Sequence, residues 1–253
     1  MQSLPRTARE RARAEITAEI LQAGRRHLAT EGAAGLSLRA IARELGMVSS
    51  AVYRYVASRD DLLTRLIIEA YDSLGAAAEA AEQPVPRADL AARWSAVCTA
   101  VRTWAIANPN EYALIYGSPV PGYVAPPDTI GPASRVSALL VQIMIDQHPG
   151  ARPPSERPTS AGLAAALAPL RAVLPASVPD QAVQAGLMAW AGLFGVVSLE
   201  MFGQFTNVIA AGPGDREAFF AECVARWAAQ LGIGPPRPDD CGGSDDRGGR
   251  GGS

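Results

Sequence analysis

The sequence predicts an all-α fold in which a small N-terminal domain of three helices precedes a larger helical domain. Apolar residues recur at the spacing of one helix face along most of the 253 residues. Glycine and proline divide these repeats into helix-sized segments, and no segment shows the strict alternation of a strand. Hydrophobic residues make up 48% of the chain and charged residues 19%, so the protein can fill a sizeable core.

Charge is distributed unevenly along the chain. Residues 1–65 contain 11 Arg and 7 acidic residues, a net charge of +4, whereas the remainder carries −6 and the whole chain −2. Residues 1–13 are interpreted as a basic N-terminal arm, with Arg6, Arg9, Arg11 and Arg13. Because guanidinium groups pair well with phosphate, the arm favours a nucleic-acid partner; a solvated helix start is the alternative.

Cysteine usage and hydropathy show no sign of export. Cys98, Cys223 and Cys241 are far apart and lack the spacing of a zinc site or a disulfide framework. The start of the chain has no apolar run suited to a signal peptide, and no uninterrupted apolar stretch approaches the roughly 18 residues of a membrane span. We therefore expect a cytoplasmic protein with no membrane contact, no metal and no cofactor.

The first helix of the small domain is expected over residues 14–30. Ile16, Ile20, Ala23 and His27 recur at helical spacing, and Gly32 ends the repeat. His27 lies on the inner stripe and is interpreted as structural.

Two short helices follow within the unit 38–56. Ser37 is expected to cap the first of them, Gly46 ends it, and Ser49 or Ser50 starts the second, which reaches to about residue 56.

The unit has the steric pattern of a helix-turn-helix. Ala42 is small where the second helix must cross, Gly46 permits a positive φ in the tight turn, and Val52 fills the wedge between the helices. The outward face of the second helix then carries Ser49, Ala51, Tyr53, Arg54 and Tyr55. We interpret it as a recognition helix for the DNA major groove; a purely structural helical hairpin is the alternative.

A fourth helix connects the two domains. Ser58 and Asp61 have the spacing of a capping box, and apolar residues extend the helix to about Glu82. The Pro-containing segment 83–89 is a candidate linker, although the helix itself could tie the domains together. We assign residues 14–65 to the helix-turn-helix domain, 66–234 to a helical ligand-binding and dimerisation domain, and 235–253 to a disordered tail.

The larger domain also consists of helical patterns. They are expected over residues 94–107, 134–146, 160–174, 180–205 and 216–231. The intervening loops 117–132 and 149–158 are rich in Pro and Gly, and they are either mobile covers of a cavity or plain connectors.

The segments GLSLRAIA at 35–42 and AVYRYVASRDDL at 51–62 resemble the TetR family of transcriptional regulators, and the resemblance spans about residues 12–70. It implies that the Tyr53 hydroxyl contacts a phosphate, that Tyr55 points to bases or sugars, and that Arg39 reaches a guanine edge. The full set of expected DNA-binding residues is Ser37, Arg39, Ser49, Ser50, Ala51, Tyr53, Arg54, Tyr55 and Arg59.

Three positions depart from that family's pattern. Val48 replaces a commonly polar residue at the start of the recognition helix, so Ser49 is expected to take over capping. Arg59 stands where lysine is usual and keeps a charge near a phosphate, and Val56 stands where phenylalanine is usual.

The larger domain resembles the branch of the family whose body carries a Trp-His-Gly motif. Trp190 and Gly192 match it, whereas Ala191 replaces the histidine. The resemblance implies a ligand-binding and dimerisation body. For an apolar cavity we predict the aromatic and sulfur side chains Trp104, Tyr112, Tyr116, Met144, Trp190 and Phe194, each of which has ordinary core as its alternative.

The pattern from residue 180 is apolar nearly all round, so the helix must be covered on both sides. Together with the last helix, it is expected to form a four-helix dimer seam that includes Leu193, Val196, Glu200, Phe220, Val224 and Trp227. The alternative is that both helices are core helices of a monomer. Glu200 is expected to meet an arginine, a cationic ligand or solvent.

These patterns predict a ligand-responsive transcriptional repressor. It would bind a palindromic DNA operator as a dimer and be released by a small apolar or aromatic effector. A helical small-molecule sensor or interaction protein without specific operator binding is the alternative. An enzyme is not expected, because the two histidines, His27 and His148, accompany no clustered base, nucleophile or phosphate loop.

Overall fold

The computed structural model describes residues 7–147, 160–172, 174–209, 212 and 214–233, and within them it contains helices and no strand. The predicted all-α class is confirmed. The elements are α1 (Ala8–Gly35), α2 (Leu38–Glu44), α3 (Ser49–Val52), α4 (Arg59–Glu82), α5 (Leu90–Ala107), α6 (Pro109–Tyr116), η1 (Pro127–Thr129), α7 (Ile130–Gln147), α8 (Ala161–Arg171), α9 (Asp180–Met201) and α10 (Asp215–Leu231).

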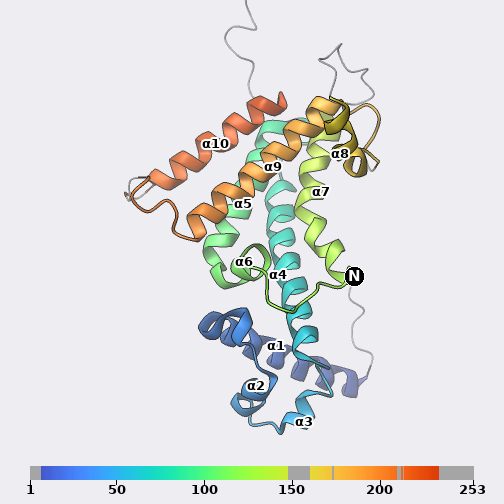
Figure 1. Ribbon diagram of the computed structural model, residues 1–253, viewed down its shortest axis with the longest axis vertical. Helices are drawn as coiled ribbons and strands as arrows, with labels where there is room; N and C mark the ends of the chain where they lie inside the picture. Colours follow the sequence, from blue (N-terminus) through green and yellow to red (C-terminus); the bar gives the residue numbers. More distant parts are fainter. Residues whose placement is uncertain (1–6, 148–159, 173, 210–211, 213, 234–253) are drawn as a thin grey trace, which may run out of the picture.

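The helices form a small head and a larger body that share α4 (Figure 1). The head consists of α1 to α3 and the first turns of α4, and the body contains α5 to α10 around the rest of α4. The head core includes Leu62 and Leu66 of α4, and the body core includes Ala70 and Leu74 of the same helix. One continuous helix therefore carries both cores, and the head cannot tilt without moving it.

Helix α1 begins at Ala8, earlier than the predicted start at residue 14. Thr7 and Glu10 form a capping box, in which the Thr7 hydroxyl accepts the Glu10 N–H at 3.2 Å and the Glu10 carboxylate accepts the Thr7 N–H at 2.9 Å. Residues 8–13 of the expected arm are therefore helical. Residues 1–6 lie outside the described part of the chain.

Gly46 makes the predicted tight turn between α2 and α3. Its φ is 65°, a value that suits glycine. The Met47 N–H donates to Ala42 O at 2.8 Å and the Gly46 N–H to Arg43 O at 3.2 Å, which together form a Schellman motif at the end of α2. Ala42 and Val52 are buried where the two helices cross, as their sizes predicted.

The recognition helix is shorter than predicted, because α3 ends at Val52 rather than near Val56. Its N-cap is Val48, whose side chain makes no capping hydrogen bond, and Ser49 is already the first helical residue, so the expectation that Ser49 caps the helix was wrong. From Tyr53 onward the chain continues in tight turns, with the Tyr55 N–H donating to Val52 O at 2.9 Å.

Helix α4 runs to Glu82, as predicted. Its start differs from a strict capping box: the Ser58 hydroxyl accepts the Asp61 N–H at 3.0 Å, but the Asp61 carboxylate accepts the Ala57 N–H at 2.8 Å instead of that of Ser58.

The body differs from the prediction mainly in its short elements. Helix α6 was not predicted, because a helix of eight residues that begins at Pro109 is too short to show a clear apolar repeat. The loop 117–132 includes η1 and the first residues of α7, while α8 ends at Arg171 and α9 at Met201, each a few residues early. The predicted loop 149–158 and tail 235–253 lie outside the described residues.

A buried ion network fastens α4, α5 and α7 together. Arg93 is fully buried, and its guanidinium binds Glu82 of α4 at 2.5 Å and Asp146 of α7 at 2.6 Å. Breaking one partner of such a network typically costs about 3–5 kcal/mol, because the other charge is left buried.

Helix α9 is long and apolar enough to cross a membrane by length and composition alone. Core helices pass the same test, and α9 here packs against α5, α7, α8 and α10 inside the body.

Candidate nucleic-acid interface and ligand cavity

The helix-turn-helix presents a polar face with free side chains. Arg39, Tyr53 and Arg54 are exposed, Tyr53 to 48%, and within the described residues their side chains have no hydrogen bond or ion pair. Ser50 is also exposed, whereas Ser49 and Ala51 are half-buried. Because free donors on a basic head suit phosphate and base edges, these residues remain the predicted DNA contacts.

Tyr55 is held by α1 instead of projecting freely. The Arg13 guanidinium lies 5.4 Å from the centre of the Tyr55 ring, and its Nη2 donates to Arg54 O at 2.8 Å. Tyr55 is half-buried and packs against the head core. Sequence reasoning missed Arg13 in this role, since 41 positions separate it from Arg54.

Arg59, predicted to contact a phosphate, is engaged within the head. Its guanidinium donates to the carbonyl oxygens of Ala33, Ala34 and Leu36 at 2.8, 3.3 and 3.2 Å. These carbonyls lie at the end of α1, where a helix leaves acceptors without internal partners. Ser37 is likewise engaged, because its hydroxyl caps α2 by accepting the Ala40 N–H at 3.4 Å.

His27 has the structural role expected of it. Its Nε2 lies 2.8 Å from a carboxylate oxygen of Glu44, which also pairs with Arg26 at 2.6 Å. Hydrogen bonds from Arg26 hold the pKa of Glu44 below its usual value, so α1 and α2 are tied by an ionised carboxylate.

The body contains an apolar cavity of about 180 Å³. It lies among α5, α7, α8 and α9, and its lining consists of Trp94, Ser137, Leu140, Val141, Met144, Leu170, Leu174, Val183, Gly186, Leu187 and Trp190. Met144 and Trp190 are therefore the two predicted cavity residues that line it.

The other predicted cavity residues pack elsewhere. Tyr112, Tyr116 and Phe194 form an aromatic cluster, with ring centres 5.0 Å apart for the two tyrosines and 4.5 Å apart for Tyr116 and Phe194. The Tyr112 hydroxyl lies 2.8 Å from the Ser198 hydroxyl, and burial raises the pKa of Tyr112. Trp104 donates its indole N–H to the Ser73 hydroxyl at 2.9 Å. Trp104, Tyr112 and Phe194 are part of the body core and Tyr116 packs against it, and none of the four lines this cavity.

The predicted dimer residues are mostly engaged within the chain. Leu193, Phe220 and Val224 are buried, and Val196 and Trp227 are half-buried, with the Trp227 ring packed on Gly192. Glu200 binds Arg102 of α5 in a bidentate pair with both distances 2.7 Å, so its partner is an arginine of the same chain.

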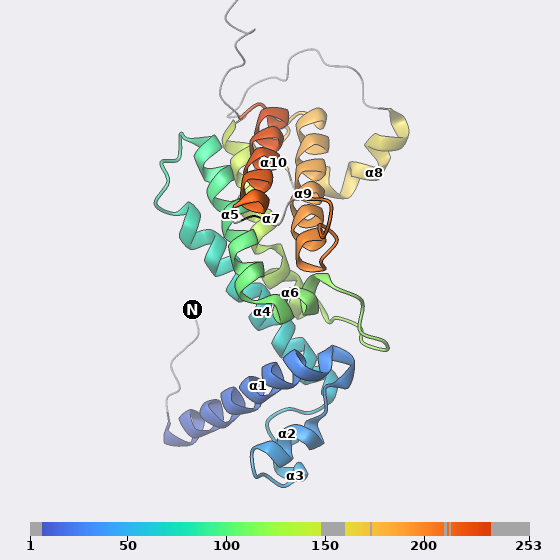
Figure 2. The ribbon, with the colours of Figure 1, turned by 90° about the vertical axis from the view of Figure 1, so that its left-hand side faces the viewer.

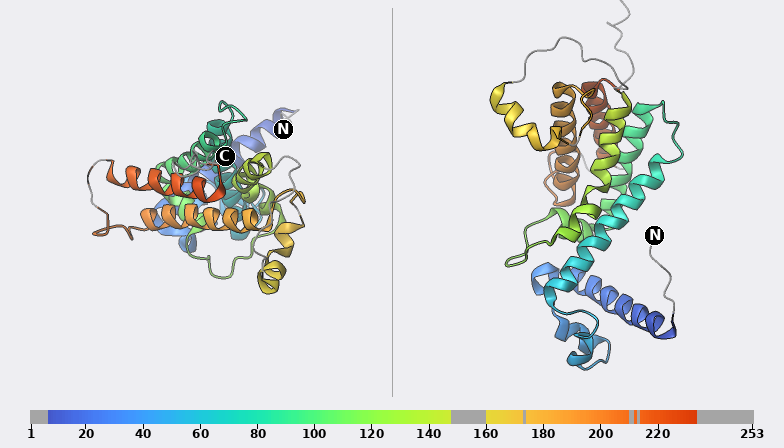
Figure 3. Two further views of the ribbon diagram at one scale, coloured as in Figure 1. Left: turned by 90° about the horizontal axis from the view of Figure 1, so that it is seen from above. Right: turned by 90° about the vertical axis from the view of Figure 1, so that its right-hand side faces the viewer.

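A different set of apolar residues is exposed on this side of the body. Helices α9 and α10 lie side by side (Figures 1 and 3). The exposed large side chains on α9, on the turn after it and on α10 are Leu187, Met188, Trp190, Leu199, Phe202, Val208 and Phe219. Because α9 is apolar nearly all round, its sequence could not show which of its faces the body covers. A dimer seam on these helices would use the exposed set.

Within the described residues, no group of three or more His, Cys, Asp or Glu side chains could hold a metal ion.

Comparisons with known proteins agree with this architecture. The family model described as "Bacterial regulatory proteins, tetR family" matches residues 20–66, and that described as "Tetracyclin repressor-like, C-terminal domain" matches residues 94–227. The HTH-type transcriptional regulator Rv1816 of Mycobacterium tuberculosis is 44% identical over 212 residues, which cover 81% of this chain and 89% of that protein. The HTH-type transcriptional regulator Mb1846 of Mycobacterium bovis matches to the same extent.

Solved structures share the fold. The crystal structure of SCO4313 superposes with a TM-score of 0.72 at 34% identity, covering 88% of this chain and 100% of that one. The TetR family transcriptional regulator PfmR of Thermus thermophilus has a TM-score of 0.51 at 18% identity, over 86% of this chain and 99% of that one, which shows the fold alone.

A helix-turn-helix head on a helical body, shared with these regulators over most of the chain, defines a DNA-binding transcriptional regulator. Its family is equally plain: the protein belongs to the TetR family, as the segments at 35–42 and 51–62 indicated.

Proposed function

We propose that this regulator is a cytoplasmic repressor that binds a palindromic operator as a homodimer and is released when a small apolar effector enters the body. The observation that carries the proposal is the apolar cavity of about 180 Å³ in the body. The same body packs around α4, and α4 also contributes to the core of the head. A molecule that binds there better in one tilt of α4 than in another shifts the population between the two tilts.

The exposed apolar side chains of α9 and α10 support dimerisation. A palindrome presents two equivalent half-sites, and a twofold dimer presents two equivalent heads. Joining two copies through α9 and α10 would remove Leu199, Phe202 and their exposed neighbours from water.

A chain of contacts supports communication between the cavity and the head. Trp190, which lines the cavity, lies 5.5 Å from Phe194, which lies 4.5 Å from Tyr116 of α6 (ring centres). Helix α6 packs on α1, and Leu114 of α6 contacts the head core.

The loop after α6 adds a second contact to the head. It extends from the body beside α1 (Figure 2), and the Tyr123 hydroxyl lies 2.9 Å from the Thr64 hydroxyl of α4.

Because coupling between two sites is reciprocal, operator DNA would weaken effector binding by the same factor by which effector weakens DNA binding.

Recovery of genomic DNA bound by the purified protein tests the proposal. We expect the recovered fragments to share an inverted repeat whose half-sites are about one helical turn, or a multiple of it, apart. The variant Arg39→Ala/Tyr53→Phe is the control and should recover few of them, because it removes two free side chains of the head face. Recovery of fragments without a common repeat would instead favour the alternative of a small-molecule sensor that lacks specific operator binding.

A further inference from the structure

We infer that the cavity among α5, α7, α8 and α9 takes a small uncharged molecule, about one ring in size, that carries a single hydroxyl or carbonyl oxygen for Ser137. The inference rests on the proposed function, because it describes the effector of that site.

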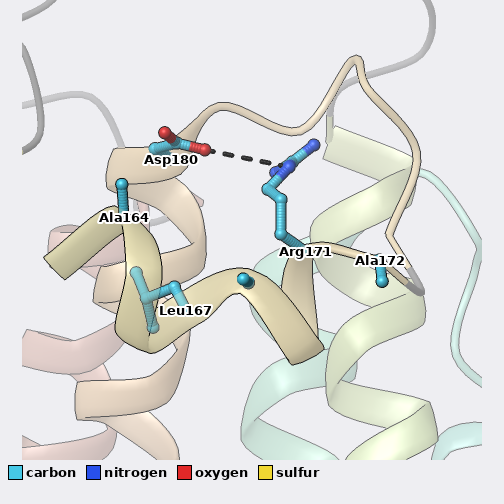
Figure 4. Close-up of a pocket in the computed structure, with 6 residues that line it drawn as sticks. Ala164, Leu167, Arg171, Ala172 and Asp180 are labelled. Carbon is cyan, nitrogen blue, oxygen red and sulfur yellow. Dashed lines mark ion pairs between the residues drawn. The ribbon is translucent and has the colours of Figure 1, made fainter. Parts of the chain in front are cut away.

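The lining offers no partner to a charged ligand. All eleven lining residues are apolar or glycine, except Ser137, and none carries a charge. Placing an unpaired carboxylate or ammonium in such a site would cost several kcal/mol. A charged pair beside the cavity is already engaged: Arg171 and Asp180 face a neighbouring hollow and lie 3.7 Å apart (Figure 4). The Arg171 guanidinium also donates to Val178 O at 2.6 Å and to Pro175 O at 2.7 Å.

The volume limits the size of the molecule. The cavity measures about 180 Å³, and an apolar cavity of about 150 Å³ in another protein takes benzene. One substituted ring therefore fills the space, whereas larger ligands need pockets of about 300 Å³ or more. Gly186 lets the Met144 side chain pack closely against α9, because a methyl group there would collide with the Met144 sulfur.

Ser137 calls for an oxygen on the ligand. Its hydroxyl has no hydrogen-bond partner within the described residues, whereas Ser134, one turn earlier, donates to Ile130 O and Gly131 O of its own helix. The Trp94 indole N–H, which is also in the lining, already donates to Val224 O at 3.2 Å. A pure hydrocarbon would cover the Ser137 hydroxyl and leave it unpaired, which carries a desolvation cost.

Three para-substituted toluenes test the inference: 4-methylphenol and 1,4-dimethylbenzene, which have nearly the same shape, and 4-methylbenzoate, which carries a charge on a slightly larger group. Tryptophan fluorescence is the readout, because two of the four tryptophans, Trp94 and Trp190, line the cavity. We expect 4-methylphenol to give a saturable change and dimethylbenzene to bind several-fold more weakly, about tenfold at most, which is the range of one hydrogen bond. We expect 4-methylbenzoate not to bind.

Matched variants locate the effect. Ser137→Ala should lower the affinity for 4-methylphenol to that for dimethylbenzene, and Ser134→Ala should change neither, because Ser134 is not part of the lining. Val141→Phe, at a half-buried lining residue, should fill the cavity and weaken both neutral probes.

Binding of 4-methylbenzoate as tight as that of 4-methylphenol would overturn the inference. So would the absence of binding by all three probes, or a Ser137→Ala variant that keeps the wild-type preference.

Titration of operator DNA separates a failure of the inferred ligand class from a failure of the proposed function. If 4-methylphenol binds by the rules above but leaves DNA affinity unchanged, the ligand class stands and the effector role fails. If it weakens DNA binding equally in wild type and Ser137→Ala, the effector role stands and the ligand class fails.

Discussion

Arg39 and Arg59 lie in the same head with the same charge, yet their surroundings differ. Arg39 is exposed and has no partner within the described residues, whereas Arg59 donates to three carbonyl groups at the end of α1. A free guanidinium can bind a phosphate, and an engaged one stabilises the fold.

Replacing each arginine by alanine distinguishes these roles. Arg39→Ala should reduce the salt dependence of DNA binding by about 0.9 in log–log slope for each phosphate that Arg39 neutralises, with little change in stability. Arg59→Ala should lower the free energy of unfolding by about 1–3 kcal/mol, because three carbonyls lose their partner, and leave the salt slope unchanged. DNA titrations at several salt concentrations and urea unfolding measure the two effects. If Arg59→Ala reduced the salt slope and Arg39→Ala lowered the free energy of unfolding, the structural role of Arg59 would be refuted.

Tyr53 offers a hydroxyl that the chain does not use. Its side chain is 48% exposed, and within the described residues its hydroxyl has no hydrogen bond. Tyr53→Phe should therefore leave the unfolding temperature unchanged and weaken DNA binding about tenfold, the size of one hydrogen bond to a charged group. The loss should be the same for operator and scrambled DNA, because phosphate contacts carry no sequence information. A loss restricted to the operator in fluorescence anisotropy would instead assign Tyr53 to base recognition.

Among the elements, α1 contacts the turn that follows α3. With four residues and no side-chain cap, α3 has little intrinsic stability, and Arg13 of α1 holds the turn that follows it.

We predict that Arg13→Ala weakens operator binding several-fold more than Arg11→Ala. Both variants remove one positive charge from the exposed start of α1, but Arg13 alone of the two contacts the segment 54–55. The additional loss of operator affinity in Arg13→Ala therefore reports how Arg13 positions the recognition element, because both variants lose the same charge. Equal losses in the two variants, measured by DNA titration at one salt concentration, would show that the contact contributes nothing to binding.

The ion network joining α4, α5 and α7 makes stability depend on pH. Burial alone would raise the pKa of Asp146, but hydrogen bonds from Arg93 and Gln142 and the charges of Arg87 and Arg93 hold it below its usual value. Because the folded pKa lies below the unfolded one of roughly 3.9, the ionised carboxylate stabilises the protein above that pH. This contribution is lost progressively as the pH falls from there through the folded pKa.

Asp146→Asn should accordingly lower the free energy of unfolding at neutral pH and flatten its decline in acid. Urea unfolding between about pH 6 and pH 3 checks this. An Asp146→Asn protein whose stability declines in acid as steeply as that of the wild type would contradict the assignment.

For the whole molecule, the exposed apolar residues of α9 and α10 would decide how the proposed dimer presents its two heads to DNA. Leu199 is 45% exposed on α9, close to the exposed Phe202. Leu199→Asp would place a charge in the proposed seam, where burial without a partner is costly.

We expect Leu199→Asp to shift the protein from dimer to monomer in sedimentation equilibrium and to weaken operator binding strongly. Val124→Asp is the matched control, because Val124 is an exposed apolar residue on the loop after α6 and belongs to neither α9 nor α10. A Leu199→Asp protein that remains a dimer with wild-type operator affinity would place the seam elsewhere.

Whether a feature could be predicted depended on how far apart its interacting residues lie along the chain. The tight turn at Gly46, the cap at Ser37 and the end of α4 at Glu82 were predictable, because each depends on residues within a few positions along the chain. The partner of Glu200 was not, since Arg102 lies 98 positions away on α5.

By itself, then, the sequence determined the helical class, the helix-turn-helix and the family, because helix repeats and tight turns are local properties of the backbone. Only the tertiary structure decided which apolar side chains line a cavity, which are core and which face outward. That choice depends on which distant helix covers each face, and an apolar helix such as α9 carries no local signal of its neighbours.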